Sequence, residues 1–415
     1  MKALIVSISD IEGGAARAAF RLHKALLAEN VDSRMLVQGK SCDDIRVVSE
    51  LNKVKKSLNK LRPFLDSILI RFYKNRNQAL FSPAYLPFSD IVKKINDLKP
   101  DIVHLHWICN GMLRIEDLVK IKAPIVWSLH DMWAFTGGCH YTEGCERYQS
   151  GCGNCKILGS NKVNDLSSRV FNRKQKTYLK LPYLTIVGLS RWMAKSAKGS
   201  SLLKNKKIIN LPNPIDTNTF KPCDRDEVRK LWNLPLDKKM ILFGAMGATS
   251  DPRKGFQELL RALSGIENNS NIELAVFGSS EPKNPPKFSF KTHYLGQLSD
   301  DVSLCSLYNA VDVVVLPSLQ ENLSNTIMES LSCATPVVAF DIGGNGDMIE
   351  HQKNGYLAKL FDTFDLAYGI EWVLDNLEYE KLCKNAREKV LREFDSKIVA
   401  KKYIELYQSI LDDRL

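Results

Sequence analysis

Short apolar runs recur along the chain, and most are followed by a polar or glycine-containing turn and then by a helical pattern. Continuous apolar runs are typical of parallel strands that helices cover on both faces. The pattern predicts strands at 3–8, 101–107, 125–131, 183–190, 240–244, 274–278, 293–296, 311–316 and 337–341. The alternation of strands with helices predicts an α/β fold built on parallel sheets.

The spacing of these elements predicts two domains. A chain of 415 residues is too long for one comfortable core and fits two domains of about 200 residues each. Strand 183–190 is expected to be the last of the first domain, and the proline-containing stretch 208–222 is typical of a linker. We therefore predict domains at 1–212 and 213–395, followed by a terminal helix at 396–415.

The stretch 311–341 has the clearest chemistry. Val311–Leu316 is a buried-strand pattern that Pro317 ends, and Ser324 or Asn325 can cap the next helix, whose free N–H groups would attract an anion. Glu321 and Glu329 flank that helix terminus and can accept hydrogen bonds from hydroxyl groups. The arrangement suits a sugar nucleotide, and an ordinary strand–helix unit with two solvated acids remains the alternative.

The spacing of Glu321 and Glu329, with Thr335–Ala339 and Gly343-Gly344, resembles the E-x7-E element of retaining glycosyltransferases of family 4. The resemblance implies the GT-B fold, two Rossmann-like domains facing each other across a cleft, with the final helix crossing back to the first. It implies that Glu321 holds donor-sugar hydroxyls, Glu329 the ribose, and Ser324, Asn325 and Thr326 the diphosphate. The family's Glu-Gly-Phe-Gly is replaced here by Glu321-Asn322-Leu323-Ser324.

A pair of cations precedes the helix that starts near residue 256. Arg253 and Lys254 could clamp a diphosphate, although such surface pairs are usually only solvated. By resemblance, Lys254 matches the family's phosphate-binding lysine. Ala245 stands where the family has an arginine, so Arg253 is the candidate replacement. The resemblance also places Gly278 and Leu295 beside the nucleobase.

The first domain offers a weaker set of candidates. Gly13 and Gly14 follow the first strand and are either a simple turn or, by resemblance, part of the site that holds acceptor or donor phosphate. His130 matches the histidine that the family places beside the donor sugar, where it stabilises developing charge. His106 and Asp131 are less secure candidates, and His106 could equally be a core histidine with satisfied hydrogen bonds.

A cysteine-rich insertion at 136–159 follows directly. Cys139, Cys145, Cys152 and Cys155 lie among glycine-rich turns, and His140 is adjacent. Four such ligands would hold a structural zinc ion tetrahedrally, with no open position for catalysis. Four ordinary thiols, or two disulfides in an oxidising compartment, are the alternatives.

Charge and targeting signals bear on the partners. The net charge of +11 favours an acidic partner, and no nucleic-acid-binding motif accompanies it, so nucleic acid is not expected. Segment 52–76 interleaves basic and apolar residues, which suits an amphipathic helix on an anionic membrane or an interior-facing helix with a solvated basic side. Pro63 is expected to break any single long helix there. No export signal or membrane span is evident, which predicts a cytoplasmic protein, peripheral at the inner face of the membrane.

The combined prediction is an enzyme. By resemblance it moves a sugar, with retention and without a catalytic metal, from a UDP or GDP sugar to a hydroxyl of a growing, lipid-linked surface glycan. The motif Asp224-Arg225-Asp226 falls in the predicted linker and does not suggest a catalytic metal. Two alternatives remain: a non-catalytic glycan- or membrane-binding subunit of the same fold, and a sugar-nucleotide epimerase.

Overall fold

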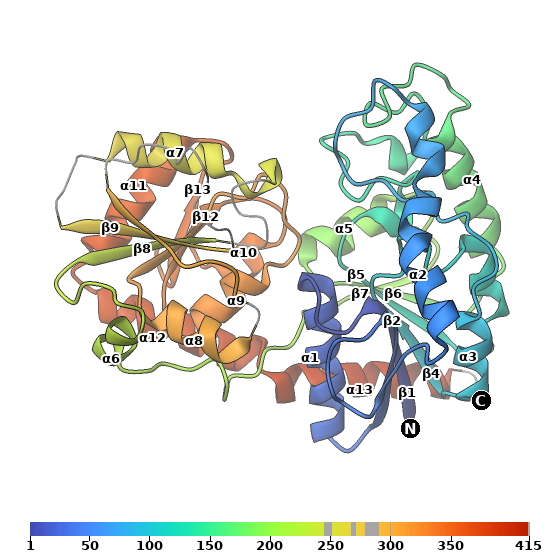
Figure 1. The fold of residues 1–415 in the computed structure, drawn as a ribbon, viewed down its shortest axis with the longest axis horizontal. Helices are drawn as coiled ribbons and strands as arrows, with labels where there is room; N and C mark the ends of the chain where they lie inside the picture. Colours follow the sequence, from blue (N-terminus) through green and yellow to red (C-terminus); the bar gives the residue numbers. More distant parts are fainter. Residues whose placement is uncertain (245–250, 267–270, 279–289, 299, 414–415) are drawn as a thin grey trace. The chain divides into compact units, whose positions relative to one another are not determined.

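The computed structural model describes residues 1–244, 251–266, 271–278, 290–298 and 300–413. The chain forms two compact units, drawn in Figure 1. Unit 1 contains Met1–Asn213 and Val399–Leu415, and unit 2 contains Pro214–Ile398. Each unit is built on one parallel sheet, so the predicted α/β fold with two Rossmann-like domains is confirmed.

Seven strands form the sheet of unit 1, in the order β3-β2-β1-β4-β5-β6-β7. All neighbouring strands are parallel. The order reverses between β1 and β4, which is the position where open α/β sheets bind ligands. The strands are β1 (Lys2–Ser9), β2 (Asp32–Gly39), β3 (Val47–Val48), β4 (Ile102–Leu105), β5 (Ile125–Leu129), β6 (Leu184–Gly188) and β7 (Lys207–Asn210).

The prediction that 183–190 is the last strand of this sheet was wrong, because β7 pairs beside β6. Its Ile208 and Ile209 are only partly buried, as befits an edge strand, so β7 lacks the fully apolar pattern of the interior strands. The prolines that predicted a linker begin two residues after β7 ends.

Helices and short 3-10 turns surround this sheet. They are α1 (Gly14–Ala28), α2 (Lys53–Asp66), η1 (Ile68–Phe72), α3 (Ile91–Asp97), η2 (Ile115–Lys120), η3 (Trp133–Phe135), η4 (Arg147–Gln149), α4 (Leu166–Tyr178), α5 (Arg191–Gly199) and α13 (Ser396–Asp412). From Val399 onward, α13 belongs to unit 1, where the hydroxyl of Tyr407 lies 2.6 Å from His104 Nδ1 on β4. The last helix thus closes one face of the first sheet.

Helix α2 buries polar residues and exposes apolar ones, which is the reverse of the usual arrangement. Its polar Arg62 and Asp66 are buried, and they bond to the backbone of unit 1: Arg62 Nε donates to the carbonyl of Gly111 (2.6 Å), and Asp66 accepts from the amide of Ala84 (3.2 Å). Its larger apolar residues are exposed: Val54, Leu58, Leu61, Phe64 and Leu65. The interior-facing interpretation of segment 52–76 is therefore wrong for α2, because polar groups attach this helix and its apolar groups face outward, but it holds for η1, whose Ile70 is buried in the core of unit 1.

Pro63 lies inside α2 instead of breaking it. A proline removes the amide that would bond to the carbonyl four residues earlier, here that of Asn59. The side-chain amide of Gln38 donates to that carbonyl instead, at 3.2 Å. The helix ends only three residues after the proline, where Ser67 separates it from η1.

Unit 2 has a six-stranded parallel sheet in the order β10-β9-β8-β11-β12-β13, which reverses between β8 and β11. The strands are β8 (Lys239–Gly244), β9 (Ile272–Phe277), β10 (Lys291–Tyr294), β11 (Val313–Leu316), β12 (Val337–Phe340) and β13 (Gly355–Ala358). The other elements are α6 (Arg225–Leu231), η5 (Pro252–Lys254), α7 (Phe256–Gly265), α8 (Asp301–Asn309), α9 (Asn325–Ser332), α10 (Asn345–Met348), α11 (Thr363–Leu374) and α12 (Tyr379–Glu393). Figure 1 shows α7 and α11 on one side of this sheet and α8 and α9 on the other.

The Asp224-Arg225-Asp226 motif starts α6 and is not part of an open linker. The Asp224 carboxylate caps the helix by accepting from the amide of Glu227 (3.0 Å), and Arg225 pairs with Asp312 (2.8 Å). The motif therefore has a structural explanation within unit 2.

Within the ranges that the structure covers, no helix is both long and apolar enough to cross a membrane.

Candidate functional site

The best-formed candidate site lies at the carboxyl ends of β8 and β11 in unit 2, where the strand order reverses. Lys254 ends η5, and its Nζ lies 3.2 Å from Glu321 Oε2 on the loop after β11. Gly255 follows with φ of +72°, and a Cβ there would overlap the carbonyl oxygen of Pro317. Only glycine lets these two loops approach so closely, so the sequence itself positions the ion pair.

Glu321 is held from a second side. Gly343 has φ of +57°, and a Cβ there would overlap the backbone carbonyl of Glu321. The carboxylate of Glu321 also accepts from the amide of Asn322 through Oε1, at 3.2 Å. Its side chain is 12% exposed and that of Lys254 is 26% exposed. The pair is thus fixed in place and still accessible, as a ligand-binding pair must be.

Glu329 lies on α9, one turn beyond the cap. It is almost fully buried, and its Oε2 accepts from the hydroxyl of Tyr308 on α8 at 2.8 Å. Burial and the adjacent carboxylate raise the pKa of Tyr308 well above its ordinary value, so Tyr308 remains a donor at neutral pH. Ser324 caps α9 by accepting from the amide of Ile327 at 3.5 Å. Asn325 and Thr326 form the first turn of the helix.

The two predicted cations behave differently. Arg253 forms a two-point ion pair with Asp251, with Nη2 to Oδ2 at 2.6 Å and Nε to Oδ1 at 3.1 Å. Although burial opposes ionisation of Asp251, the Arg253 guanidinium beside it holds the pKa of that carboxyl below its ordinary value. Lys254 alone points to Glu321. The sequence pattern could not show whether Arg253 is available to bind a diphosphate or is already paired with the nearby Asp251.

Gly278 and Leu295 follow β9 and β10 and lie at the same edge of the sheet. The amide of Gly278 donates to the carbonyl of Gly296 (2.7 Å), and the amide of Leu295 donates to the carbonyl of Val276 (2.8 Å). These bonds continue the strand pairing beyond the ladder. Ala245, which takes the place of the family's arginine, lies outside the described residues.

Three histidines occupy the carboxyl ends of β4 and β5 in unit 1. His106 Nδ1 lies 2.8 Å from His130 Nε2, and His104 contacts Tyr407 and Ser128 (Nε2 to Oγ, 2.8 Å). Burial lowers the pKa of His104 to about 3 and that of His130 to about 4, and it takes the pKa of His106 well below 6.5. All three are neutral at pH 7, so His130 can donate or accept a hydrogen bond but brings no charge.

Asp131 is the anion of this region. Its Oδ2 accepts from Trp107 Nε1 (2.8 Å) and lies 2.6 Å from His140 Nδ1, and Ser82 Oγ lies 2.9 Å from the other ring nitrogen of His140. Burial opposes ionisation of Asp131, but the His140 contacts outweigh it and lower its pKa. His140 thus has a role that the sequence did not reveal: it orients Asp131.

Gly13 and Gly14 form the start of α1. Gly13 has φ of +92°, and a Cβ there would meet nothing within 4 Å, so the turn opens on free space. Asp10 was missed by the sequence interpretation: its Oδ2 accepts from the amides of Ser41 (2.9 Å) and Cys42 (2.8 Å). This buried carboxylate joins the loop after β1 to the loop after β2. A buried aspartate directly after a strand was the available signal.

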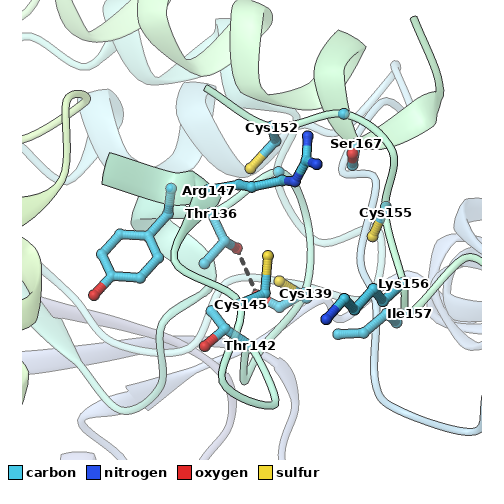
Figure 2. Close-up of a pocket in the computed structure, with 13 residues that line it drawn as sticks. Thr136, Cys139, Thr142, Cys145, Arg147, Cys152, Cys155, Lys156, Ile157 and Ser167 are labelled. Carbon is cyan, nitrogen blue, oxygen red and sulfur yellow. Dashed lines mark hydrogen bonds between the residues drawn. The ribbon is translucent and has the colours of Figure 1, made fainter. Parts of the chain in front are cut away.

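The four cysteines of the insertion line one small pocket, shown in Figure 2. In the view of Figure 2, Cys152 and Cys155 lie on different sides of the pocket, with Cys139 and Cys145 near each other, and all four thiols are free. In the part of the chain that the structure covers, no group of three or more His, Cys, Asp or Glu side chains could hold a metal ion. The zinc prediction is therefore not supported.

Two of the thiols interact with backbone amides of the insertion. Cys155 interacts with the amides of Ile157 and Leu158, and Cys152 interacts with the amide of Gly137. Burial raises the pKa of Cys139 and Cys152 to about 12, so these groups are thiols at pH 7. The Cys-x-x-Cys spacing is the same for cysteines that bind a metal ion and for cysteines that are only close in sequence, so the spacing alone could not distinguish the two.

Residues 238–376 match the family of glycosyl transferases group 1. The match begins at β8 and includes Lys254, Glu321 and Glu329, so the candidate site of unit 2 lies inside the group 1 region.

Curated relatives agree with the group 1 match. The putative colanic acid biosynthesis glycosyl transferase WcaC of Escherichia coli (strain K12) is 26% identical over 358 residues, covering 82% of this chain and 83% of that protein. The uncharacterized glycosyltransferase MJ1607 of Methanocaldococcus jannaschii is 29% identical over 42% of this chain and 46% of its own length. The UDP-Gal:alpha-D-GlcNAc-diphosphoundecaprenol alpha-1,3-galactosyltransferase of Escherichia coli is 28% identical over 46% of this chain and 51% of its own length. For the last two, the match spans about half of the relative.

Solved structures share the whole architecture. Sucrose-phosphate synthase from Thermosynechococcus elongatus aligns over 100% of both chains with a TM-score of 0.68 and 17% identity. Anabaena Alr3699/HepE, solved in complex with UDP and glucose, aligns over 99% of this chain and 100% of its own, with a TM-score of 0.64 and 16% identity. These similarities show the fold, which is the GT-B fold.

Proposed function

We propose that the protein is a glycosyltransferase that moves a sugar from a uridine or guanosine diphosphate sugar to a hydroxyl of a growing, lipid-linked surface glycan. The observation that carries the proposal is the Lys254–Glu321 pair at the strand-order reversal, followed by the buried Glu329 on α9, in the region that matches group 1. A cation, two acids and a capped helix terminus suit the diphosphate and the hydroxyls of one sugar nucleotide.

Lys254 is proposed as the cation for the diphosphate. An ammonium group has three donors, so Nζ can keep its bond to Glu321 and still reach a phosphate oxygen. The first turn of α9, with Ser324, Asn325 and Thr326, would supply further N–H groups. Arg253 is a second proposed cation, and to contribute it would have to exchange Asp251 for phosphate.

The proposed roles of the acids follow from their burial. Glu321 is accessible and would accept hydrogen bonds from donor-sugar hydroxyls, while the more deeply buried Glu329 would accept from the ribose. Gly278 and Leu295 would border the nucleobase. Because Lys254 and the helix terminus stabilise the departing diphosphate, the acceptor could attack from the same face. The transfer would then retain configuration without a carboxylate nucleophile or a catalytic metal.

Unit 1 is proposed to contribute substrate contacts through His130, Gly13 and Gly14. Since His130 is held neutral, we assign it a hydrogen bond to a sugar hydroxyl in place of the charge-stabilising role that the family resemblance implied. The open turn at Gly13 leaves space for a phosphate or an acceptor group near the backbone.

The proposed acceptor and the proposed cellular location are inferred from helix α2 and from one relative. The galactosyltransferase relative is named for a diphosphoundecaprenol substrate, which is a lipid diphosphate. Here α2 exposes Leu58, Leu61 and Phe64 by 56%, 55% and 51%, among Lys56 and Lys60. Such a face favours insertion into an anionic bilayer surface. We therefore propose a peripheral position at the inner face of the cell membrane.

A donor panel tests the function. Uridine and guanosine diphosphate sugars are added to the purified protein, and one of them should raise its melting temperature, because a ligand that binds only the folded state stabilises it. Lys254→Ala should lose this shift, and Lys384→Ala, an exposed lysine on α12, should keep it. Release of nucleoside diphosphate only with an added acceptor would exclude the epimerase. No shift with any donor would contradict the proposal and favour the non-catalytic subunit.

A further inference from the structure

A second pocket of unit 1 has no part in the proposed donor site. It lies between η1, the segment 73–75, the segment 158–162 and the start of α4, and its volume is about 560 Å³. Its apolar lining includes Leu69, Phe72, Tyr73, Leu158 and Leu166. It is large enough for a phosphate group together with the first units of a hydrocarbon chain.

Three cations line the same pocket: Lys74, Lys162 and Arg169. None of the described residues that line the pocket is an acid. Within the part of the chain that the structure covers, the side chains of the three cations form no hydrogen bond or ion pair. All three side chains are exposed, so solvent screens their mutual repulsion and leaves them accessible to an anion. Lysine and arginine donors around a common space are the usual means of holding phosphate.

The pocket walls are fastened to each other. The amide of Leu166 donates to the hydroxyl of Tyr73 at 2.8 Å, and the amide of Asn77 donates to the carbonyl of Ile157 at 3.0 Å. Gly159 has φ of +59°, and a Cβ there would overlap the carbonyl of Asn75. The two chain segments are thus held in close contact before any ligand arrives, which reduces the ordering cost of binding.

The apolar side of the pocket continues to the exposed surface. Phe72 lines the pocket and is 77% exposed. One residue before it, the guanidinium of Arg71 lies over the ring of Phe64 on α2, 4.2 Å from its centroid. Exposed apolar residues are thus present both at the pocket, in Phe72, and on the helix that precedes it in the chain, α2.

We propose that this pocket binds the phosphate end of an amphiphile, with Lys74, Lys162 and Arg169 on the phosphate and Phe72 on the hydrocarbon chain. The inference rests on the proposed function only in naming the lipid carrier of the acceptor as that amphiphile. A bilayer phospholipid offers the same chemistry, and the experiment distinguishes the two sources.

The test uses the full chain with Lys162→Glu and Arg169→Glu combined. Lys176→Glu with Lys180→Glu is the matched control, because both lysines are exposed, lie on or just after α4, and change the net charge equally. Both proteins should keep the wild-type melting temperature. Binding is measured to farnesyl diphosphate, to inorganic diphosphate, and to phosphatidylglycerol and phosphatidylcholine vesicles.

The pocket variant should bind farnesyl diphosphate at least about tenfold more weakly than the control, since about 1.4 kcal/mol of lost interaction is tenfold. Inorganic diphosphate should bind more weakly than farnesyl diphosphate to the wild type. A loss confined to phosphatidylglycerol vesicles supports the pocket with a bilayer lipid as its source. Equal binding of farnesyl diphosphate and of both kinds of vesicle by variant and control overturns the proposal, as does inorganic diphosphate binding as tightly as farnesyl diphosphate.

The same preparations separate this inference from the donor site. Stabilisation by nucleoside diphosphate sugars should be the same in the pocket variant, the control and the wild type, because the proposed diphosphate and ribose groups lie in unit 2 and none of the substituted residues is among the proposed contacts of unit 1. A wild type that binds farnesyl diphosphate through these cations but no sugar nucleotide would contradict the proposed function and leave the pocket standing. Binding of a sugar nucleotide without binding of farnesyl diphosphate would support the proposed function and contradict the proposal for the pocket.

Discussion

The two sheets present polar residues at equivalent edges but arrange them differently. At the end of β4 and β5, buried histidines bond mainly to one another and to hydroxyl groups of unit 1, and burial keeps them neutral. At the end of β8 and β11, Lys254 and Glu321 are charged partners that remain accessible. The difference indicates that unit 1 uses its polar groups mainly for structure at this edge, while unit 2 keeps charges available for a ligand.

The largest effect should come from the accessible cation. Replacing Lys254 by Ala removes the proposed charge on the departing diphosphate, and loss of one such donor typically lowers turnover by roughly 10²-fold to 10³-fold. Turnover with the best donor is the measurement, and Lys384→Ala is the control. Wild-type turnover in Lys254→Ala would show that the accessible charge at the edge of the second sheet does not serve the ligand, and would contradict the functional difference between the two sheets.

Gly343→Ala should disturb the same site without removing a functional group. The left-handed backbone and the overlap with the carbonyl of Glu321 force the Glu321 loop to move, and a shift of about 1 Å can lower a rate by up to roughly 10²-fold. Gly265→Ala is the control, because a Cβ there meets nothing within 4 Å. Equal turnover of the two variants would show that the position of Glu321 is unimportant.

A pH change should affect unit 1 first. The unfolded chain protonates His104 below about pH 6.5, but the folded protein does not until about pH 3, so the stabilisation is present above pH 6.5 and is lost as the pH falls. Between pH 7 and pH 5 the loss is on the order of 2 kcal/mol for this histidine, or roughly thirtyfold.

Amide hydrogen exchange, corrected for intrinsic rates, measures this effect. Exchange in β4 and β5 should become faster at pH 5, and exchange in β11 and β12 serves as the internal control. A uniform change in both sheets, or none in either, would contradict the assignment of a neutral buried cluster to unit 1.

The smallest effect should come from Glu329→Gln. This change keeps the shape of the side chain but removes its charge, and a hydrogen bond to a charged group contributes roughly 1.5–3 kcal/mol. Affinity for the nucleoside diphosphate should fall about tenfold, as measured by calorimetry. Tyr308→Phe, which keeps the carboxylate and removes its partner, should cost less. Unchanged affinity in Glu329→Gln would exclude this residue from the nucleotide site.

Much of the fold could be predicted because parallel strands buried on both faces have an unmistakable apolar pattern. The prediction also missed the strands β2, β3 and β13. For the missed edge strand β7 and the inverted helix α2 the cause is the same: their burial depends on tertiary neighbours. Arg62 can be buried because the carbonyl of Gly111, 49 residues away, accepts a hydrogen bond from its guanidinium. No local pattern contains that information.

The candidate site was predictable to the level of residue type and chain position. Lys254 and Glu321 do come together, since glycines at 255 and 343 bring their loops close. The sequence did not reveal that Arg253 is paired with Asp251, that Tyr308 bonds to Glu329, or that the four cysteines line one pocket. These facts depend on side-chain direction, which spacing along the chain does not determine.

The central claim is that the carboxyl edge of the second sheet, at β8 and β11, binds the nucleoside diphosphate. The most direct measurement is amide hydrogen exchange of the full chain with and without saturating uridine or guanosine diphosphate. We predict slower exchange at 251–256 and 317–329 with one of the two nucleotides, and unchanged exchange at 158–162. Protection that is absent from 251–256 and 317–329 with both nucleotides would contradict the claim.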